Sequence, residues 1–322
     1  MPASTASTVQ GARRRLGQVG VWLAPTTLAA TPATAQRQAA ARLEALGLGS
    51  LWGGERIGSR ETFAQHTILL AATESLVIGI GVANMWMRRG IAVQAGAATL
   101  AEAYPNRFML GVGVSHDHQV ERIGLKWERP VQQMREYLDE MDAAALKFPE
   151  LAQPAFPFIL AALGPKMLEL ARNRAGGALT FLSPVKHTAA ARKLLGPDKL
   201  LIVHQAVVLE PDPAQARALA RENLTSGQTA STVYGKNFLR LGYTDHDVAD
   251  GCSNRLIDDI VAWGDEPAIA RRIQGHLDAG ADHVLLHPIT SDRLMVQPDP
   301  HDVSAAVTQL ERLAPALPLT TS

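Results

Sequence analysis

The chain has 322 residues, of which 47% are hydrophobic, enough for one large core or two smaller ones. Its 31 basic and 31 acidic residues balance, and neither sign forms a long run, which argues against nucleic acid or an anionic membrane as the main partner. The single cysteine, Cys252, excludes an internal disulfide and fits a reducing cytoplasm, and no run of about 20 apolar residues predicts a membrane span.

Residues 1–17 are rich in serine, threonine and alanine and include three successive arginines at 13–15. A secretory signal needs an apolar stretch after its basic residues, and none follows here. We therefore predict a flexible N-terminal tail over residues 1–17. No low-complexity linker marks a boundary further on, so residues 18–322 are expected to form a single domain and the protein to be cytoplasmic.

From residue 18 onward, short apolar runs alternate with stretches of helical spacing. The predicted strands cover residues 18–23, 51–56, 76–82, 107–113, 158–161, 177–182, 200–209 and 283–287. The predicted helices cover residues 31–46, 61–73, 90–103, 132–146 and 266–279 and begin near residues 164, 212 and 300, while residues 225–263 are expected to form several short helices. Eight strands separated mostly by helices predict a (β/α)8 TIM barrel with insertions rather than an open doubly wound sheet.

One stretch, PNRFMLGVGVSHDH over residues 105–118, looks like the centre of a functional site. Its apolar strand ends at glycines and opens directly into Ser115, His116, Asp117 and His118. Because barrel enzymes place their sites at the carboxyl ends of the strands, we expect a site here. His116–Asp117–His118 has a spacing that could bind a metal, but the flanking sequence offers no further ligands, so no metal is predicted.

Several segments together carry a family likeness. LVIGIGVANMWMRRG, PNRFMLGVGVSH and AWGDEPAIARRIQGHLDAGADHVLL resemble the bacterial luciferase-like family of flavin- and deazaflavin-dependent oxidoreductases. ILAALGPKMLELARNRAGGAL, KHTAAARKLLGPDKL and NFLRLGYTDHD resemble a branch of that family described as probable coenzyme F420-dependent. The resemblance runs over residues 19–288. It implies a (β/α)8 barrel with insertions, F420 or alternatively FMN at the carboxyl ends of the strands, hydride transfer and often a homodimer.

The resemblance also implies cofactor contacts. It places a non-prolyl cis peptide at Gly81–Val82, followed by Ala83, against the back of the cofactor ring, although glycines that serve only strand packing give the same pattern. It places the cofactor phosphate at the turn Leu163–Gly164–Pro165, where a glycine, a proline at the first helical position and a helix N-terminus suit an anion, as they also suit any well-formed turn. Ser115 is expected to contact the cofactor, and Lys186 either adds to the anion site or is simply solvated.

Candidate catalytic residues follow two strands. Relatives carry an acidic residue and then a proton-transferring histidine where this chain has Glu55 and Arg56. Arginine stays protonated, so Arg56 is a poor acid or base but a good clamp for an anion or a carbonyl; a surface ion pair is the alternative. His116 could serve as an acid or base near neutral pH, or only hold its loop.

Large apolar residues lie at or just beyond the strand ends. Trp22, Trp52, Met85 and Trp86 could line a substrate pocket, although Trp22 and Trp52 equally fit the barrel core. His204, His283 and His287 lie on apolar strands and are expected to be buried with backbone partners. The main expectation is hydride transfer between F420 and a small organic substrate; an FMN-dependent monooxygenase and a non-catalytic flavin-binding barrel are the alternatives.

Overall fold

A computed structural model describes residues 5–224, 232–249, 251–290 and 302–319. Eight parallel strands form a closed barrel in the order β6-β5-β4-β3-β2-β1-β9-β7, with β7 pairing back to β6. These strands are β1 (Val19–Leu23), β2 (Ser50–Gly53), β3 (Val77–Asn84), β4 (Phe108–Gly113), β5 (Phe158–Ala161), β6 (Gly177–Thr180), β7 (Leu200–Val208) and β9 (His283–Pro288). The predicted (β/α)8 barrel is confirmed.

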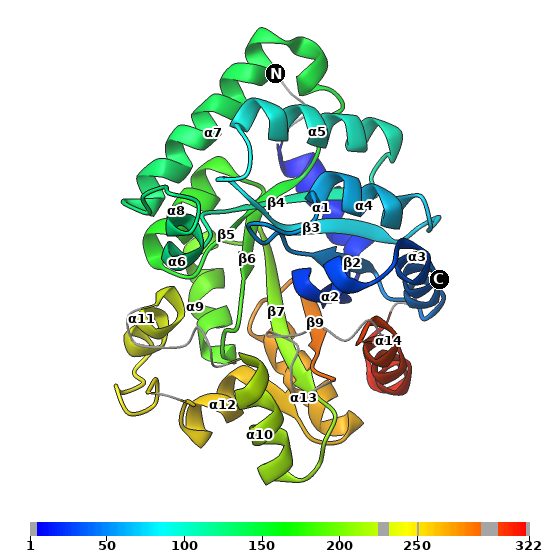
Figure 1. Cartoon of the computed structure of the whole chain (residues 1–322), viewed down its shortest axis with the longest axis vertical. Helices are drawn as coiled ribbons and strands as arrows, with labels where there is room; N and C mark the ends of the chain where they lie inside the picture. The colour runs from blue at the N-terminus through cyan, green and yellow to red at the C-terminus, as the bar shows by residue number, and fades with distance from the viewer. Residues whose placement is uncertain (1–4, 225–231, 250, 291–301, 320–322) are drawn as a thin grey trace.

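Helices alternate with the strands and surround the barrel (Figure 1). They are α2 (Pro25–Ala30), α3 (Ala33–Ala45), α4 (Thr62–Leu70), α5 (Gly90–Ala103), α6 (Asp117–Glu121), α7 (Pro130–Lys147), α8 (Pro165–Arg174), α9 (Val185–Leu195), α10 (Pro213–Leu224), α11 (Val233–Arg240), α12 (Asn254–Ile260), α13 (Glu266–Asp278) and α14 (Asp302–Leu313). A large apolar cluster fills the space between these helices and the sheet. Among the described residues, no helix is long and apolar enough to cross a membrane.

Two predictions about the strands differ from the fold. Residues 225–263 were expected to form only short helices; α11 and α12 are such helices, but Val261–Trp263 form a strand, β8, that pairs with Ala206–Val208 of β7. Residues 225–231 and residue 250 of that stretch lie outside the described residues. The second strand ends at Gly53, so Glu55 and Arg56 stand in the loop beyond it rather than at its last positions.

The flexible tail predicted over residues 1–17 is wrong for Thr5–Leu16, which form helix α1. Val9, Ala12 and Leu16 are buried in the same apolar cluster as residues from inside the barrel. The serine- and alanine-rich composition hid this apolar face, which recurs at helical spacing. Helix α1 therefore closes the amino-terminal end of the barrel.

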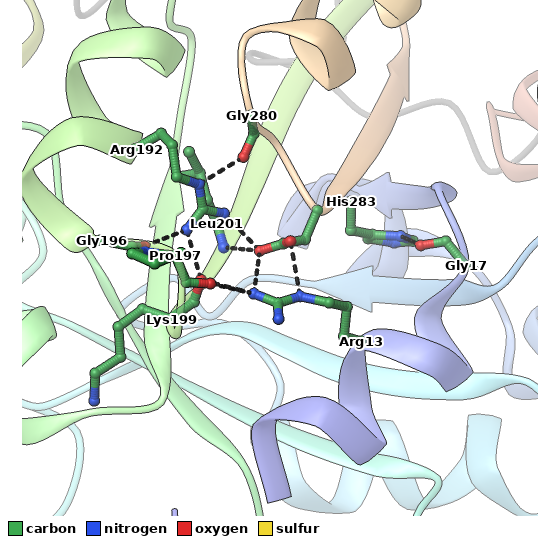
Figure 2. A network of polar contacts seen from close by, with 10 residues as sticks. Arg13, Gly17, Arg192, Gly196, Pro197, Lys199, Leu201, Gly280 and His283 are labelled. Carbon is green, nitrogen blue, oxygen red and sulfur yellow. Dashed lines mark hydrogen bonds and ion pairs between the residues drawn. The ribbon is translucent and has the colours of Figure 1, made fainter. Parts of the chain in front are cut away.

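A polar network fixes α1 at that end (Figure 2). The Asp282 carboxylate, just before β9, is within 2.8 Å of Nε of Arg13 and 2.6 Å of a terminal nitrogen of Arg192. It also accepts a hydrogen bond from the amide of Leu201 at 2.8 Å. Arg13 donates further to the carbonyls of Pro197 and Lys199. The network thereby ties α1 to the starts of β7 and β9.

Side chains fill the barrel interior, as the alternation of strands requires. Trp52 is fully buried there, and its indole N–H donates to Oγ of Ser50. A Cβ at Gly79 would overlap the Trp52 ring, so this glycine is required for packing. Ser50 in turn lies 2.7 Å from Nε2 of His283, whose Nδ1 lies 2.9 Å from the carbonyl of Gly17. As expected, His283 is buried and has a backbone partner.

Candidate active site at the carboxyl ends of the strands

Trp22, near the end of β1, forms the floor of the carboxyl face. Its indole N–H donates to the carbonyl of Gly81 at 2.8 Å. Its ring meets the edges of Phe181, His204 and His287, with ring centroids 4.7 to 5.1 Å apart. Trp22 thus joins β1 to β3, β7, β9 and the residue after β6. It is 7% exposed, whereas Trp52, its register partner on β2, is fully buried. Trp52 therefore belongs to the core and does not line a substrate pocket.

The peptide bond between Gly81 and Val82 is cis, as the family resemblance implied. Val82 is half-buried and Ala83 is buried on the same strand. The register between β3 and β4 shifts between Ile80 and Ala83. The predicted geometry is thus present, and it lies directly beside the indole of Trp22.

Glu55 and Arg56 are neighbours in sequence with different surroundings. The Glu55 side chain has no exposed surface; it accepts two hydrogen bonds from Arg88 and one from the amide of Asn84 at 2.9 Å. Arg88 also contacts Glu61 at 3.1 Å. Because both oxygens of Glu55 are engaged, its carboxylate serves the structure and is not free to transfer protons. Arg56 is exposed, and although its carbonyl accepts a hydrogen bond from the amide of Ser59 at 3.0 Å, its side chain makes no hydrogen bond or ion pair with the described residues.

Met85 and Trp86 lie on the outer side of this region. Together with Arg89 and α7 residues they line a cavity of about 440 Å³. The indole N–H of Trp86 donates to the carbonyl of Val114 at 2.8 Å, and the indole of Trp127 donates to the same oxygen at 3.1 Å. Both tryptophans therefore hold the loop that follows β4.

That loop presents His116. Ser115 has a positive φ of 61°, and His116 precedes the first residue of α6. The His116 ring stacks on His118, with centroids 5.7 Å apart, and lies 5.4 Å from the ring of Tyr234. Burial lowers the pKa of His116, the His118 ring lowers it further, and Asp117 acts in the opposite direction. His116 is therefore neutral at neutral pH and able to accept a proton.

Tyr234, on α11, extends the aromatic surface across the face. Its ring lies 6.2 Å from Phe181, which stacks on His204 at 3.5 Å. Burial raises the pKa of the Tyr234 phenol, so it stays protonated. A continuous aromatic surface thus runs from His116 to the floor at Trp22. Tyr234 stands in no motif that marks it in the sequence, because α11 reaches this surface only through the fold.

The turn at Leu163–Gly164–Pro165 begins α8. Gly164 precedes the helix, Pro165 is its first residue, and no side chain caps its free amides. A Cβ at Gly164 would lie 3.7 Å from two guanidinium nitrogens of Arg240. Arg240 is exposed and donates to Oδ1 of Asn237 at 2.8 Å, which leaves other N–H groups available. A helix N-terminus next to a guanidinium suits an anion, and phosphate in particular.

His187 supports this turn from α9. Its Nε2 donates to the carbonyl of Leu163 at 2.9 Å, and its Nδ1 is buried without a partner among the described residues. Burial lowers the pKa of His187, the Leu163 carbonyl raises it and Arg240 lowers it. Lys186 is exposed, with its ammonium 3.8 Å from the ring centroid of Tyr243. Lys186 therefore has a partner in the neighbouring insertion rather than in the Gly164 turn.

His204 and His287 also lie close together, which sequence analysis did not foresee. Nε2 of His204 is 3.0 Å from Nδ1 of His287. His204 has the backbone partner that was predicted for it, because its Nδ1 is 3.5 Å from the Leu182 amide. His287 makes no backbone hydrogen bond through its side chain among the described residues.

Other features of the molecule lie away from this face. A cavity of about 480 Å³ lies at the amino-terminal end, lined by α1, the starts of β3 and β4 and residues 153–157. None of the predicted site residues lines it. Among the described residues, no three His, Cys, Asp or Glu side chains are grouped so as to hold a metal ion.

A closed parallel barrel with polar and aromatic groups gathered at its carboxyl ends defines a TIM-barrel protein with an enzyme-like site. The family model for luciferase-like monooxygenases matches residues 16–283, and the chain belongs to this family.

Two curated relatives are 5,10-methylenetetrahydromethanopterin reductases, each 27% identical to this chain. The match to the enzyme of Methanolobus tindarius covers 55% of this chain and 62% of the relative, and that to the enzyme of Archaeoglobus fulgidus covers 44% and 47%. The chain thus spans about half to three fifths of the reductases it matches.

Solved structures share the fold over nearly the whole chain. The coenzyme F420-dependent tetrahydromethanopterin reductase of Methanopyrus kandleri has a TM-score of 0.70 and 17% identity, covering 93% of this chain and 99% of its own. An F420-dependent secondary alcohol dehydrogenase in complex with an F420–acetone adduct has a TM-score of 0.69 and 16% identity, with 95% and 99% covered. The oxygenating constituent of 3,6-diketocamphane monooxygenase from Pseudomonas putida, in complex with FMN, has a TM-score of 0.63 and 12% identity, with 95% and 100% covered.

Proposed function

We propose that this protein is an F420-dependent oxidoreductase that transfers hydride between the deazaflavin and a small organic substrate. The observation that carries the proposal is the uncapped N-terminus of α8 beside the guanidinium of Arg240. This arrangement suits the phosphate of F420 and that of FMN alike. It lies at the carboxyl ends of the strands, on the same face as the Gly81–Val82 peptide and the aromatic floor. Two of the similar structures belong to proteins named as F420-dependent.

The residues present fit a phosphate-bearing cofactor. The free amides of α8 and the guanidinium of Arg240 would hold the phosphate, and His187 would keep the Leu163 carbonyl turned away from it. Gly81, Val82 and Ala83 would contact the ring from behind, with Ser115 beside it. F420, when bound, supplies the hydride chemistry.

The chain itself would position the substrate and handle protons. The aromatic surface from Tyr234 to Trp22 would pack against the apolar part of the substrate. His116, neutral at neutral pH, is proposed as a proton acceptor. Arg56, whose exposed side chain has no partner among the described residues, is proposed as a clamp for a polar substrate group. The small-molecule substrate and the homodimer are likewise part of the proposal.

Two parallel titrations of the purified protein test the anion site, one with F420 and one with F0, which lacks the phosphate. Cofactor fluorescence measures binding in both. We expect Arg240→Ala to weaken F420 binding by about 10- to 100-fold, the range for a lost hydrogen bond to a charged group, and to leave F0 binding unchanged. Lys236→Ala is the matched control, because Lys236 is exposed on the same helix. An equal loss for F420 and F0 would show that Arg240 does not bind the phosphate.

The same titration with FMN and riboflavin separates the cofactors. Tight F420 and weak FMN binding support the proposal; the reverse favours an FMN-dependent monooxygenase, which would consume oxygen with reduced cofactor, whereas a deazaflavin forms no such oxygen adduct. F420 that binds but is neither reduced nor reoxidised by any donor or acceptor would favour a non-catalytic barrel. Binding of neither cofactor would overturn the proposed function.

A further inference from the structure

A pair of histidines lies in the uppermost layer of the barrel interior. His287 is on the same face of β9 as Leu285 and His283, because side chains alternate along a strand, and these two point into the barrel. His204 is fully buried, and His287 is 8% exposed. Trp22 and Phe181 surround the pair. Two buried imidazoles in such apolar surroundings are costly unless their hydrogen bonds are satisfied.

The hydrogen bonds indicate where the protons are. The amide of Leu182 lies 3.5 Å from Nδ1 of His204, which favours a lone pair on Nδ1 and the proton of His204 on Nε2. That proton is donated to Nδ1 of His287 at 3.0 Å. The proton of His287 is therefore on its Nε2. Burial lowers the pKa of His287 to about 3, and burial and the His287 ring lower that of His204, so both rings are neutral.

The Nε2–H of His287 has no acceptor among the described residues. It is absent from the buried polar atoms that lack a partner, so it keeps some contact with solvent. It is thus a fixed donor at the top of the barrel interior, open to the carboxyl face and bordered by the Trp22 ring. The indole of that same tryptophan donates to Gly81, which links the donor to the proposed cofactor position.

The geometry points to His287 as the residue that recognises the substrate's oxygen, with His204 as a positioning residue that holds its tautomer. This inference rests on the proposed function and narrows its substrate class to carbonyl compounds and the corresponding alcohols. A neutral N–H donor favours an oxygen acceptor and disfavours a cationic iminium or ammonium group at the same place.

The chemistry balances for a ketone. Reduced F420, when bound, would supply the hydride for the new C–H bond at the carbonyl carbon and would itself be oxidised. The C=O π electron pair would move to oxygen, where the Nε2–H of His287 would stabilise it. The oxygen then takes a proton from water, because His204 receives an amide N–H at Nδ1 and cannot replace a proton lost by His287.

Binding of an oxygen-bearing probe to the F420-loaded protein tests this inference. The fluorescence of bound F420 is titrated with cyclohexanone and with methylenecyclohexane, which has the same shape but no oxygen. We expect cyclohexanone to bind about three- to tenfold more tightly, the usual worth of one neutral hydrogen bond. His287→Phe should abolish this preference, while His287→Gln, which keeps a donor of similar reach, should restore most of it. His283→Gln, at the other end of the same strand, should leave the preference intact.

A second measurement does not depend on a variant that folds. In protein labelled with ¹⁵N-histidine, the Nε2–H tautomer of His287 should be seen directly, and its signal should move on adding cyclohexanone. An unmoved His287 signal, a different tautomer, no cyclohexanone preference, or a preference that survives His287→Phe would each overturn the inference. Failure of the wild-type protein to bind F420 would instead overturn the proposed function.

Discussion

The Glu55 carboxylate joins the ends of β2 and β3. Burial lowers the pKa of Arg88, but the hydrogen bond and the charge of Glu55 outweigh that effect, so the pKa of Arg88 is raised above its ordinary value. The pair is asymmetric: Glu55 has no exposed side-chain surface, whereas Arg88 is 13% exposed and has a second carboxylate in Glu61. Loss of either partner therefore has different consequences.

We expect Arg88→Met to lower the free energy of unfolding by about 3 to 5 kcal/mol, because it leaves a buried carboxylate without its counter-ion. Glu55→Gln should lower the free energy of unfolding by clearly less, because Arg88 keeps its ion pair with Glu61. Urea denaturation of both variants measures the difference. Arg89→Met is the control, because Arg89 is exposed and its ion pair with Glu140 should contribute less than about 1 kcal/mol. Equal losses for Arg88→Met and Glu55→Gln would contradict this asymmetry.

Single residues show where sequence reasoning succeeds and where it ends. The turn at Gly164–Pro165 and the cis peptide at Gly81–Val82 lie within short motifs, so their geometry was predictable. Arg240 lies 76 residues beyond Gly164, and nothing in its own neighbourhood indicates that α11 returns to the start of α8. The His204–His287 pair likewise depends on β9 lying beside β7 in the closed barrel.

At the scale of elements, hydrophobic spacing predicted the strands of the barrel but not the two elements that complete it. β8 has only three residues, too few for an alternation to be recognised, and it exists because β7 offers it an edge. Helix α1 has a polar composition, and its apolar face becomes meaningful only when the barrel supplies a surface to cover. Both elements are therefore stabilised by tertiary contacts rather than by local propensity.

Helix α1 should stabilise the fold by covering the amino-terminal end of the barrel. Leu16 is fully buried against the barrel interior, so we expect Leu16→Ala to lower the free energy of unfolding by about 2 to 5 kcal/mol. Arg14 is exposed on the same helix, and Arg14→Ala should change it by less than about 0.5 kcal/mol. Chemical denaturation measures both. A flexible N-terminal segment would instead make both substitutions equally silent.

At the scale of the whole molecule, several histidines are buried in the neutral form. Burial lowers the pKa of His283 to about 4, despite its bond to the Gly17 carbonyl, and lowers the pKa of His276 and His287 to about 3. Paired acidic groups act at lower pH: hydrogen bonds from Ser253 and Thr244 lower the pKa of Asp247 to about 2. The histidines therefore dominate the loss of stability in mild acid.

The sign of the effect follows from linkage. These histidines have folded-state pKa values below the ordinary 6.5, so the unfolded chain binds more protons as the pH falls below 6.5. Their contribution is fully present above about pH 6.5 and is lost progressively toward pH 4 for His283 and toward pH 3 for His276 and His287, at about 1.4 kcal/mol per pH unit for each histidine. The three together should remove about 4 kcal/mol per unit near pH 5, a large part of a typical stability of about 5 to 15 kcal/mol. Urea denaturation at half-unit steps from pH 7.5 to 4.5 measures the slope as protons taken up on unfolding.

His283→Asn should reduce this proton uptake on unfolding by about one proton, even though it also weakens the fold. A free energy of unfolding that stays constant between pH 6.5 and 5 would show that these rings are not buried as neutral imidazoles.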